Sequence, residues 1–249
     1  MIEEQPINLY EYERLAKDRM PQHEWDFVEG GATDEITINR TREAFDSIML
    51  RPRMLVDVDQ RDLTTTVLGE KIDFPVMLSP AGHHNRAHPE AEIATVKAAN
   101  EMNVGMILSS GSSVVMEDVV GASSRPIWFQ QYFYRDQALT ELMAHRAEDS
   151  GYSALCVTLD ASVQSKRERN IRNNYPGRAT PNYDGMGSEE DFSVRSTYRP
   201  SSDDAPANVT GMVSPKVTWE EFDWLASKTD LPLIAKGVMT AEDAKLAVD

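Results

Sequence analysis

Polar residues that could bind a ligand stand at or near the ends of five short apolar segments. The segments are Phe74–Leu78, Val104–Leu108, Ile127–Phe133, Ala154–Leu159 and Pro232–Ala235, and the polar residues are Ser79, Ser109, Gln130, Thr158 and Lys236. Ligands of parallel α/β folds collect at the carboxyl ends of the strands. One polar residue in such a place is usually an ordinary strand-end hydrogen bond, but five in succession favour a shared binding site.

Two further polar side chains are placed to face the same ligand. Residues two apart on a strand point to the same side, so Tyr132 accompanies Gln130 and Asp160 accompanies Thr158. Lys236 directly follows a buried segment, and a buried ammonium group needs an anionic partner. That partner is either an anionic ligand or a carboxylate such as that of Asp160, and the residues alone leave both open.

A charged run, Lys166–Arg169, follows the fourth apolar segment. Such runs are usually solvated loops, but an arginine here could also clamp a carboxylate through parallel hydrogen bonds. His83, His84 and His88 lack the cysteine or acidic spacing of a metal site, so we expect a loop that enters a helix, and no metal. Cys156 lies in an apolar run and is expected to be a buried core residue rather than a nucleophile.

The apolar segments alternate with amphipathic helices, which predicts an α/β fold with a parallel sheet and right-handed crossovers. Helical spacing over residues 8–47 predicts a helical cap that precedes the sheet. The interval between Thr158 and Lys236 is too long for one strand–helix unit. Residues 174–216, rich in Pro, Gly, Ser, Asn and Asp, are expected to form a lid-like insertion that is partly mobile.

Composition limits the class of protein. The chain has 249 residues, enough for one substantial domain over residues 1–249, and a formal net charge of −16. Such an acidic surface repels phosphate backbones and anionic lipid, so we expect no nucleic-acid or membrane partner. The start is acidic and resembles no signal peptide, and we find no apolar run of membrane-spanning length. A cytoplasmic location is the default expectation.

Several longer motifs resemble those of one family, the FMN-dependent 2-hydroxy-acid oxidases and dehydrogenases, which includes glycolate oxidase, lactate oxidase, lactate monooxygenase and mandelate dehydrogenase. The motifs are Val28–Glu35, Leu50–Arg53, Ala87–Glu92, Trp128–Tyr132, Thr158–Asp160 and Ala235–Ala244. Each is weak alone, but their order and spacing are specific. The resemblance implies a (β/α)₈ barrel of which residues 74–249 hold about the first five strands. It also implies an FMN cofactor, a small L-2-hydroxy acid such as lactate or glycolate as substrate, and possible tetramers.

The resemblance assigns a role to each candidate site residue. The turn Ser79-Pro80-Ala81-Gly82 would lie against the flavin, Ser109, Gln130 and Thr158 would hydrogen-bond its ring, and Lys236 would stabilise its reduced, anionic form. Tyr132, Arg167 and Phe27 would contact the substrate, Arg167 through the carboxylate. Asp160 would orient a catalytic histidine and stabilise its charged form.

Departures from the family pattern affect substrate choice and activity. Phe27 stands where a tyrosine is usual, Pro80-Ala81-Gly82 where Pro-Thr-Ala is usual, and Gly111 where some members have a bulky residue. The family pattern continues past Asp249 into the histidine base, a second substrate arginine and the phosphate site. We therefore expect a truncated barrel that is inactive on its own. The alternatives are a non-catalytic remnant that binds flavin weakly and, less favoured, another phosphate-binding barrel enzyme; the electron acceptor is left open.

Overall fold

The computed structural model describes residues 5–163, 165–178, 180–184 and 212–248. The chain divides into two compact units. We call them the helical unit, which comprises residues Met1–Arg61 and Ser165–Pro176, and the sheet unit, which comprises Asp62–Gln164 and Gly177–Asp249.

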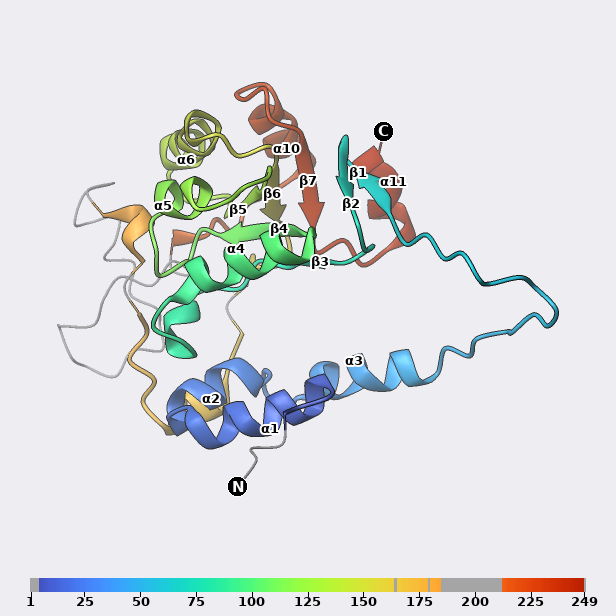
Figure 1. Ribbon diagram of the computed structural model, residues 1–249. Helices are drawn as coiled ribbons and strands as arrows, with labels where there is room; N and C mark the ends of the chain where they lie inside the picture. The colour runs from blue at the N-terminus through green and yellow to red at the C-terminus, as the bar shows by residue number, and fades with distance from the viewer. Residues whose placement is uncertain (1–4, 164, 179, 185–211, 249) are drawn as a thin grey trace. The chain divides into compact units, whose positions relative to one another are not determined.

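The sheet unit is built on five parallel strands in the order β3-β4-β5-β6-β7 (Figure 1). They are β3 (Met77–Leu78), β4 (Gly105–Ser109), β5 (Trp128–Tyr132), β6 (Leu155–Thr158) and β7 (Leu233–Lys236). Spatial order equals chain order, as expected for successive right-handed strand–helix units of a barrel. The prediction of an α/β fold with the first five barrel strands is confirmed.

Helices cover one face of this sheet. They are α4 (Ala91–Met102), α5 (Met116–Gly121), α6 (Gln137–Ser150) and α10 (Trp219–Ala226), all of which contribute to the core cluster. The sheet unit also contains α11 (Ala241–Val248), none of whose residues is buried. Phe129, Leu155 and Val157 on the strands are buried in one core cluster with Met143 and Ala147 of α6. Because side chains alternate along a strand, Gln130 and Thr158 point to the opposite face. The hydrophobic core thus fixes which side of the sheet carries the polar residues.

Local capping sets the starts of these helices. The Asp136 side chain accepts a hydrogen bond from the Ala138 backbone at 2.9 Å at the start of α6, and Gly151 ends that helix with a φ of 93°. Thr218 and Glu221 form a reciprocal capping box at the start of α10. Before α11 the Thr240 hydroxyl accepts from the Asp243 backbone amide at 3.1 Å and donates to the Asp243 carboxylate at 2.8 Å.

An antiparallel hairpin precedes the sheet and was not expected from the sequence. It pairs β1 (Thr65–Val67) with β2 (Glu70–Ile72). Leu68 and Gly69 have φ values of 46° and 84°, as in the primed turns that suit two-residue hairpins. Ile72 is buried, and Arg125 donates to the Lys71 carbonyl at 2.8 Å, so the hairpin is fixed to the loop before β5.

The helical unit contains α1 (Leu9–Arg19), α2 (Gln22–Glu29), α3 (Ile36–Asp46) and the short helix α7 (Glu168–Arg172). The sequence around α7, residues 165–176, lies far along the chain but packs against α2. We call residues 165–176 the strap. It brings the basic run of the sequence into the same unit as the amino-terminal helices.

The predicted insertion, residues 174–216, is described only at its two ends, because residues 185–211 lie outside the described part of the chain. The first end contains a 3₁₀ turn, Pro181–Tyr183, in which Asn182 and Tyr183 are buried. At the second end Val213 forms an isolated bridge with Tyr134. Among the described residues, no helix is long and apolar enough to cross a membrane.

Candidate functional site

Three polar side chains form a hydrogen-bonded row across β4, β5 and β6. The Ser109 hydroxyl donates to Gln130 Oε1 at 3.1 Å, and Gln130 Nε2 donates to Thr158 Oγ1 at 2.9 Å. All three residues are buried. Each hydroxyl fixes one end of the Gln130 amide, so the orientation of that amide follows from the network. We call Ser109, Gln130 and Thr158 the polar row.

Lys236 continues the polar row onto β7. It is the register partner of Thr158, and its Nζ lies 3.7 Å from Asp160 Oδ1. Both side chains remain partly exposed, 38% for Lys236 and 52% for Asp160. Of the two partners left open by the sequence, the carboxylate is therefore present in the structure, and the exposed part of the ammonium group can still meet a ligand.

Tyr132 is a half-buried phenol on the same face as Gln130. Burial raises its pKa, and the negative charge of Asp160 raises it further, whereas a hydrogen bond with Gln130 acts in the opposite direction. The phenol therefore stays protonated at neutral pH and can donate a hydrogen bond.

The turn that follows β3 lies against the turn that follows β4. The His83 backbone amide donates to the Gly111 carbonyl at 3.0 Å. A Cβ atom on Gly82 would come within 3.0 Å of the same carbonyl oxygen, so the two backbones are as close as glycine allows. Ser79 and Ala81 are exposed and Pro80 is half-buried, which leaves this turn accessible to a planar ligand.

A residue that the sequence reasoning missed as part of the site holds these two turns. Glu92, in the first turn of α4, is fully buried and accepts hydrogen bonds from the His84 and Ser113 backbone amides, each at 3.0 Å. The sequence analysis named Glu92 only as the last residue of the motif Ala87–Glu92 and gave it no role in the site. Its spacing to Val96 and Ala99, both buried, is the signal that places it on the inner side of α4.

The helical unit holds Phe27 and Arg167 together. The Arg167 guanidinium donates to the Phe27 carbonyl at 2.8 Å and also to the Gly30 carbonyl. Its central carbon lies 4.7 Å from the centre of the Phe27 ring, a cation–π arrangement. Tyr175 of the strap stacks on the same ring, with 4.8 Å between ring centroids. The backbone and ring contacts fix the guanidinium in one place.

Arg169 connects the strap to the Val28–Glu35 motif. It pairs with Glu29 through one guanidinium nitrogen and with Glu35 through the other, the latter at 2.5 Å. The hydrogen bond from Arg169, followed by the one from the Gly31 backbone, lowers the pKa of Glu35. The motif thus serves as the docking surface for the strap that carries Arg167.

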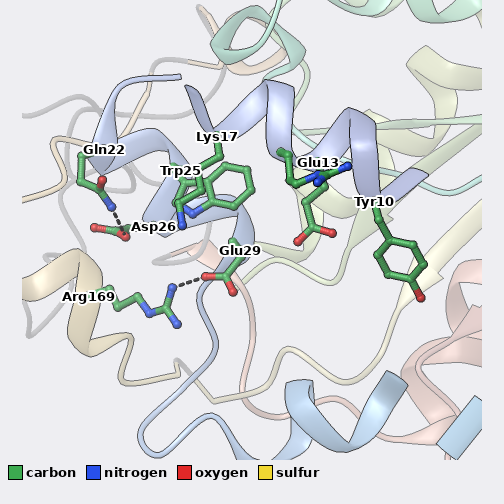
Figure 2. Close-up of a pocket in the computed structure, with 9 residues that line it drawn as sticks. Tyr10, Glu13, Lys17, Gln22, Trp25, Asp26, Glu29 and Arg169 are labelled. Atoms are coloured by element: carbon green, nitrogen blue, oxygen red, sulfur yellow. Dashed lines mark hydrogen bonds and ion pairs between the residues drawn. The ribbon is translucent and has the colours of Figure 1, made fainter. Parts of the chain in front are cut away.

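Beside this pair lies an open hollow of about 580 Å³, shown in Figure 2. Its lining residues mix acids, bases and aromatic rings: Tyr10, Glu13, Arg14, Lys17, Gln22, Trp25, Asp26, Glu29 and Arg169. The dashed contacts in Figure 2 pair Gln22 with Asp26 and Arg169 with Glu29. None of the predicted site residues lines it.

The predicted site residues therefore fall into two groups. The sheet unit brings together the polar row, Lys236, Asp160, Tyr132 and the turn 79–82, and the helical unit brings together Phe27 and Arg167. Among the described residues, no group of three or more His, Cys, Asp or Glu side chains could hold a metal ion.

Cys156 is buried between Gln130 and Ile234, its register partners, as expected for a core residue.

The chain matches the family model described as FMN-dependent dehydrogenase over residues 16–249. The chain belongs to this family. It is 39% identical over 251 residues to the L-lactate oxidase of Nostoc sp., a match that covers 98% of this chain and 67% of that protein. It is 37% identical to the peroxisomal (S)-2-hydroxy-acid oxidase GLO4 of Oryza sativa subsp. japonica, covering 98% of this chain and 65% of that one.

Two solved structures share the fold of this chain. Mandelate oxidase with (S)-4-hydroxymandelic acid matches with a TM-score of 0.83 and 31% identity, over 98% of this chain and 67% of that one. A mutant flavocytochrome b2 with pyruvate bound matches with a TM-score of 0.81 and 26% identity, over 98% and 56%. The chain thus spans about two thirds or less of the length of these relatives.

The groups on the polar face of the sheet fit the FMN cofactor of this family. The edge of an isoalloxazine ring carries hydrogen-bond acceptors and one donor. The hydroxyls and the amide of the polar row can both donate and accept hydrogen bonds, so they can pair with either kind of group. The Lys236 ammonium group continues that row on β7 and is 38% exposed. A cation in this place matches a ring that becomes anionic on reduction.

Proposed function

We propose that this chain forms the flavin-ring part of the active site of an enzyme that oxidises a small L-2-hydroxy acid to the 2-oxo acid. The observation that supports it best is the polar row, Ser109, Gln130 and Thr158, which is continued by Lys236 on one sheet face. FMN would supply the chemistry by accepting the two electrons of the substrate. The protein residues would bind and orient the flavin ring and the substrate, and would polarise them through hydrogen bonds and charge.

Each proposed role follows from the chemistry of a side chain. Ser109, Gln130 and Thr158 would hydrogen-bond the ring, Lys236 would stabilise its reduced form, and Ser79, Pro80, Ala81 and Gly82 would lie against it. Tyr132, which keeps its proton, would donate to the substrate. Arg167 would bind the substrate carboxylate, and the bare ring of Phe27 would leave the pocket less polar than a tyrosine there would. Asp160 would orient a histidine base.

The contacts found for the five histidines of the sequence are with residues other than Asp160. His84 Nδ1 lies 2.8 Å from the Thr95 hydroxyl, and the His83 ring lies 3.5 Å from Thr180. His23 and His145 lie beside glutamates at 3.7 Å and 3.9 Å, and His88 accepts from the Glu90 backbone at 3.2 Å. This favours the second candidate function for the 249-residue polypeptide, flavin binding without turnover.

The test is a flavin titration of the purified 249-residue chain, followed by a dye-linked assay with lactate, glycolate and mandelate. We expect weak FMN binding with a perturbed flavin spectrum, and no turnover. Turnover would show that the base lies within these residues. The absence of any spectral change at high FMN concentration would contradict the proposed flavin site.

The partners and the location are also proposals. A 2-hydroxy acid is the expected partner, and the electron acceptor and any tetramer are matters for experiment. The cytoplasmic location expected from the sequence stays a prediction, and relatives include proteins named as peroxisomal.

A further inference from the structure

Glu92 is a fully buried carboxylate whose hydrogen bonds join two separate loops. Its Oε1 accepts from the backbone amide of His84, in the loop after β3, and from that of Ser113, in the loop after β4, each at 3.0 Å. Its Oε2 accepts from the Ser113 hydroxyl at 2.7 Å. The Glu92 side chain therefore links the loop after β3 to the loop after β4.

The two loops also touch each other directly. The His83 amide donates to Gly111 at 3.0 Å, and the Asn85 amide donates to the Ser113 hydroxyl at 3.3 Å. With the close approach of Gly82 to Gly111, these contacts form one seam. Glu92 lies at the end of that seam and bonds to both of its sides.

The seam lies between the proposed flavin contacts of two strands. One loop begins with Ser79-Pro80-Ala81-Gly82, and the other begins after Ser109, whose hydroxyl also accepts from the Gly111 amide at 3.1 Å. Any shift of one loop against the other would change the spacing between the turn and the polar row. The seam thus controls the geometry of the groups that would face the ring.

A carboxylate in such a place is costly for stability unless every oxygen is hydrogen-bonded. Burial alone would raise the pKa of Glu92, but the hydrogen bonds from His84 and Ser113 outweigh it and hold that pKa below its ordinary value of 4.5. The group is therefore ionised at neutral pH and accepts from both loops at once.

We propose that Glu92 is a positioning residue of the flavin site, which holds the loops after β3 and β4 at the spacing the ring requires without touching it. This inference rests on the proposed function. It also makes a separate claim about the protein without flavin, namely that Glu92 couples the two loops.

The test compares Glu92→Gln with Glu92→Ala in the full 249-residue chain. Glutamine keeps an oxygen for both backbone amides and an amide for the Ser113 hydroxyl, so FMN affinity should stay within about twofold of the original. Alanine leaves two buried amides unpaired, so FMN should bind about tenfold more weakly or worse, with an altered flavin spectrum. Glu24→Ala removes a buried carboxylate of the helical unit and should leave the flavin spectrum unchanged.

A second measurement needs no flavin. Amide hydrogen exchange should accelerate in residues 80–87 and 110–116 together in Glu92→Ala, and in neither in Glu92→Gln. Unchanged exchange in the alanine variant would overturn the inference. Equal FMN affinity of the original chain and Glu92→Ala would also overturn the inference about Glu92, but would leave the proposed function intact. A failure of the original chain to bind FMN would overturn the proposed function, and with it the role of Glu92 toward the ring.

Discussion

Lys236 and Asp160 lie 3.7 Å apart, Nζ to Oδ1, at the ends of neighbouring strands, and the glycine between strand and helix makes this possible. Gly237 has a φ of 101°, and a Cβ atom on it would come within 2.5 Å of Asp160 Cγ. The aspartate therefore occupies space that any other residue at position 237 would fill. Backbone conformation and side-chain position depend on the same glycine.

Gly237→Ala should destabilise the chain by about 1–3 kcal/mol, because it adds both a strained backbone and a clash with Asp160. Urea unfolding at neutral pH measures the change. Gly121→Ala is the matched control, since a Cβ atom there meets nothing within 4 Å and its φ is ordinary. We expect the control to be neutral or slightly stabilising; equal effects at both positions would contradict this account of Gly237.

Gln130→Met should break the polar row while keeping the volume of the side chain. The buried hydroxyls of Ser109 and Thr158 would each lose a partner, which implies a loss of about 1–3 kcal/mol in the free energy of unfolding. FMN binding should weaken as well. Gln22→Met, on the exposed face of α2 where the amide bonds only to Asp26, should change stability by less than about 0.5 kcal/mol.

Arg169→Ala should loosen the strap from the helical unit, because it removes the contacts to both Glu29 and Glu35. Hydrogen exchange in residues 166–176 should become severalfold faster, and a protease should cut there sooner. Arg172→Ala is the control from the same helix, since Arg172 is 81% exposed and contacts only Glu168, at 3.8 Å. Identical exchange in the two variants would show that Arg169 does not hold the strap.

Alkaline pH should reveal the buried tyrosines. Burial raises the pKa of Tyr134 to about 12, although its hydrogen bond with Tyr183 acts in the opposite direction. Burial also raises the pKa of Tyr183 and Tyr152. The unfolded chain releases these protons near pH 10 and the folded chain does not, so stability should fall as pH rises above about 10.

Ultraviolet absorbance of phenolate measures this titration. Part of the signal should appear only when the protein unfolds, and Tyr183→Phe should remove part of the alkaline loss of stability. A folded protein whose eight tyrosines all ionise near pH 10 would contradict the buried state of these phenols.

The strands of the sheet were predictable from sequence wherever local pattern and burial agree. The predicted segments 104–108 and 154–159 differ from β4 and β6 by one residue at either end. The first segment, 74–78, forms a strand only at Met77–Leu78, and Phe74 and Val76 are exposed. The β1–β2 hairpin was missed because the short run Thr65–Val67 carries little apolar alternation.

The sequence predicted which side chains belong to the site, but it did not predict which residues they contact. The strand-end positions of Ser109, Gln130 and Thr158 follow from the two-residue periodicity of strands, and the structure links them. The roles of Glu92 and Arg169 depend on partners far along the chain, such as Ser113 for the first and Glu29 for the second. No local pattern encodes such pairs, because the fold brings them together only after the strands and helices have packed.

The single cysteine of the chain makes the sheet under the proposed flavin site open to a chemical probe. Cys156 is 2% exposed and lies on β6, paired with Gln130 on one side and Ile234 on the other. Burial raises the pKa of its thiol, so a thiol-specific reagent should react only when these strands separate. The rate of that reaction reports how often β5, β6 and β7 open, and a ligand held by the polar row should slow it.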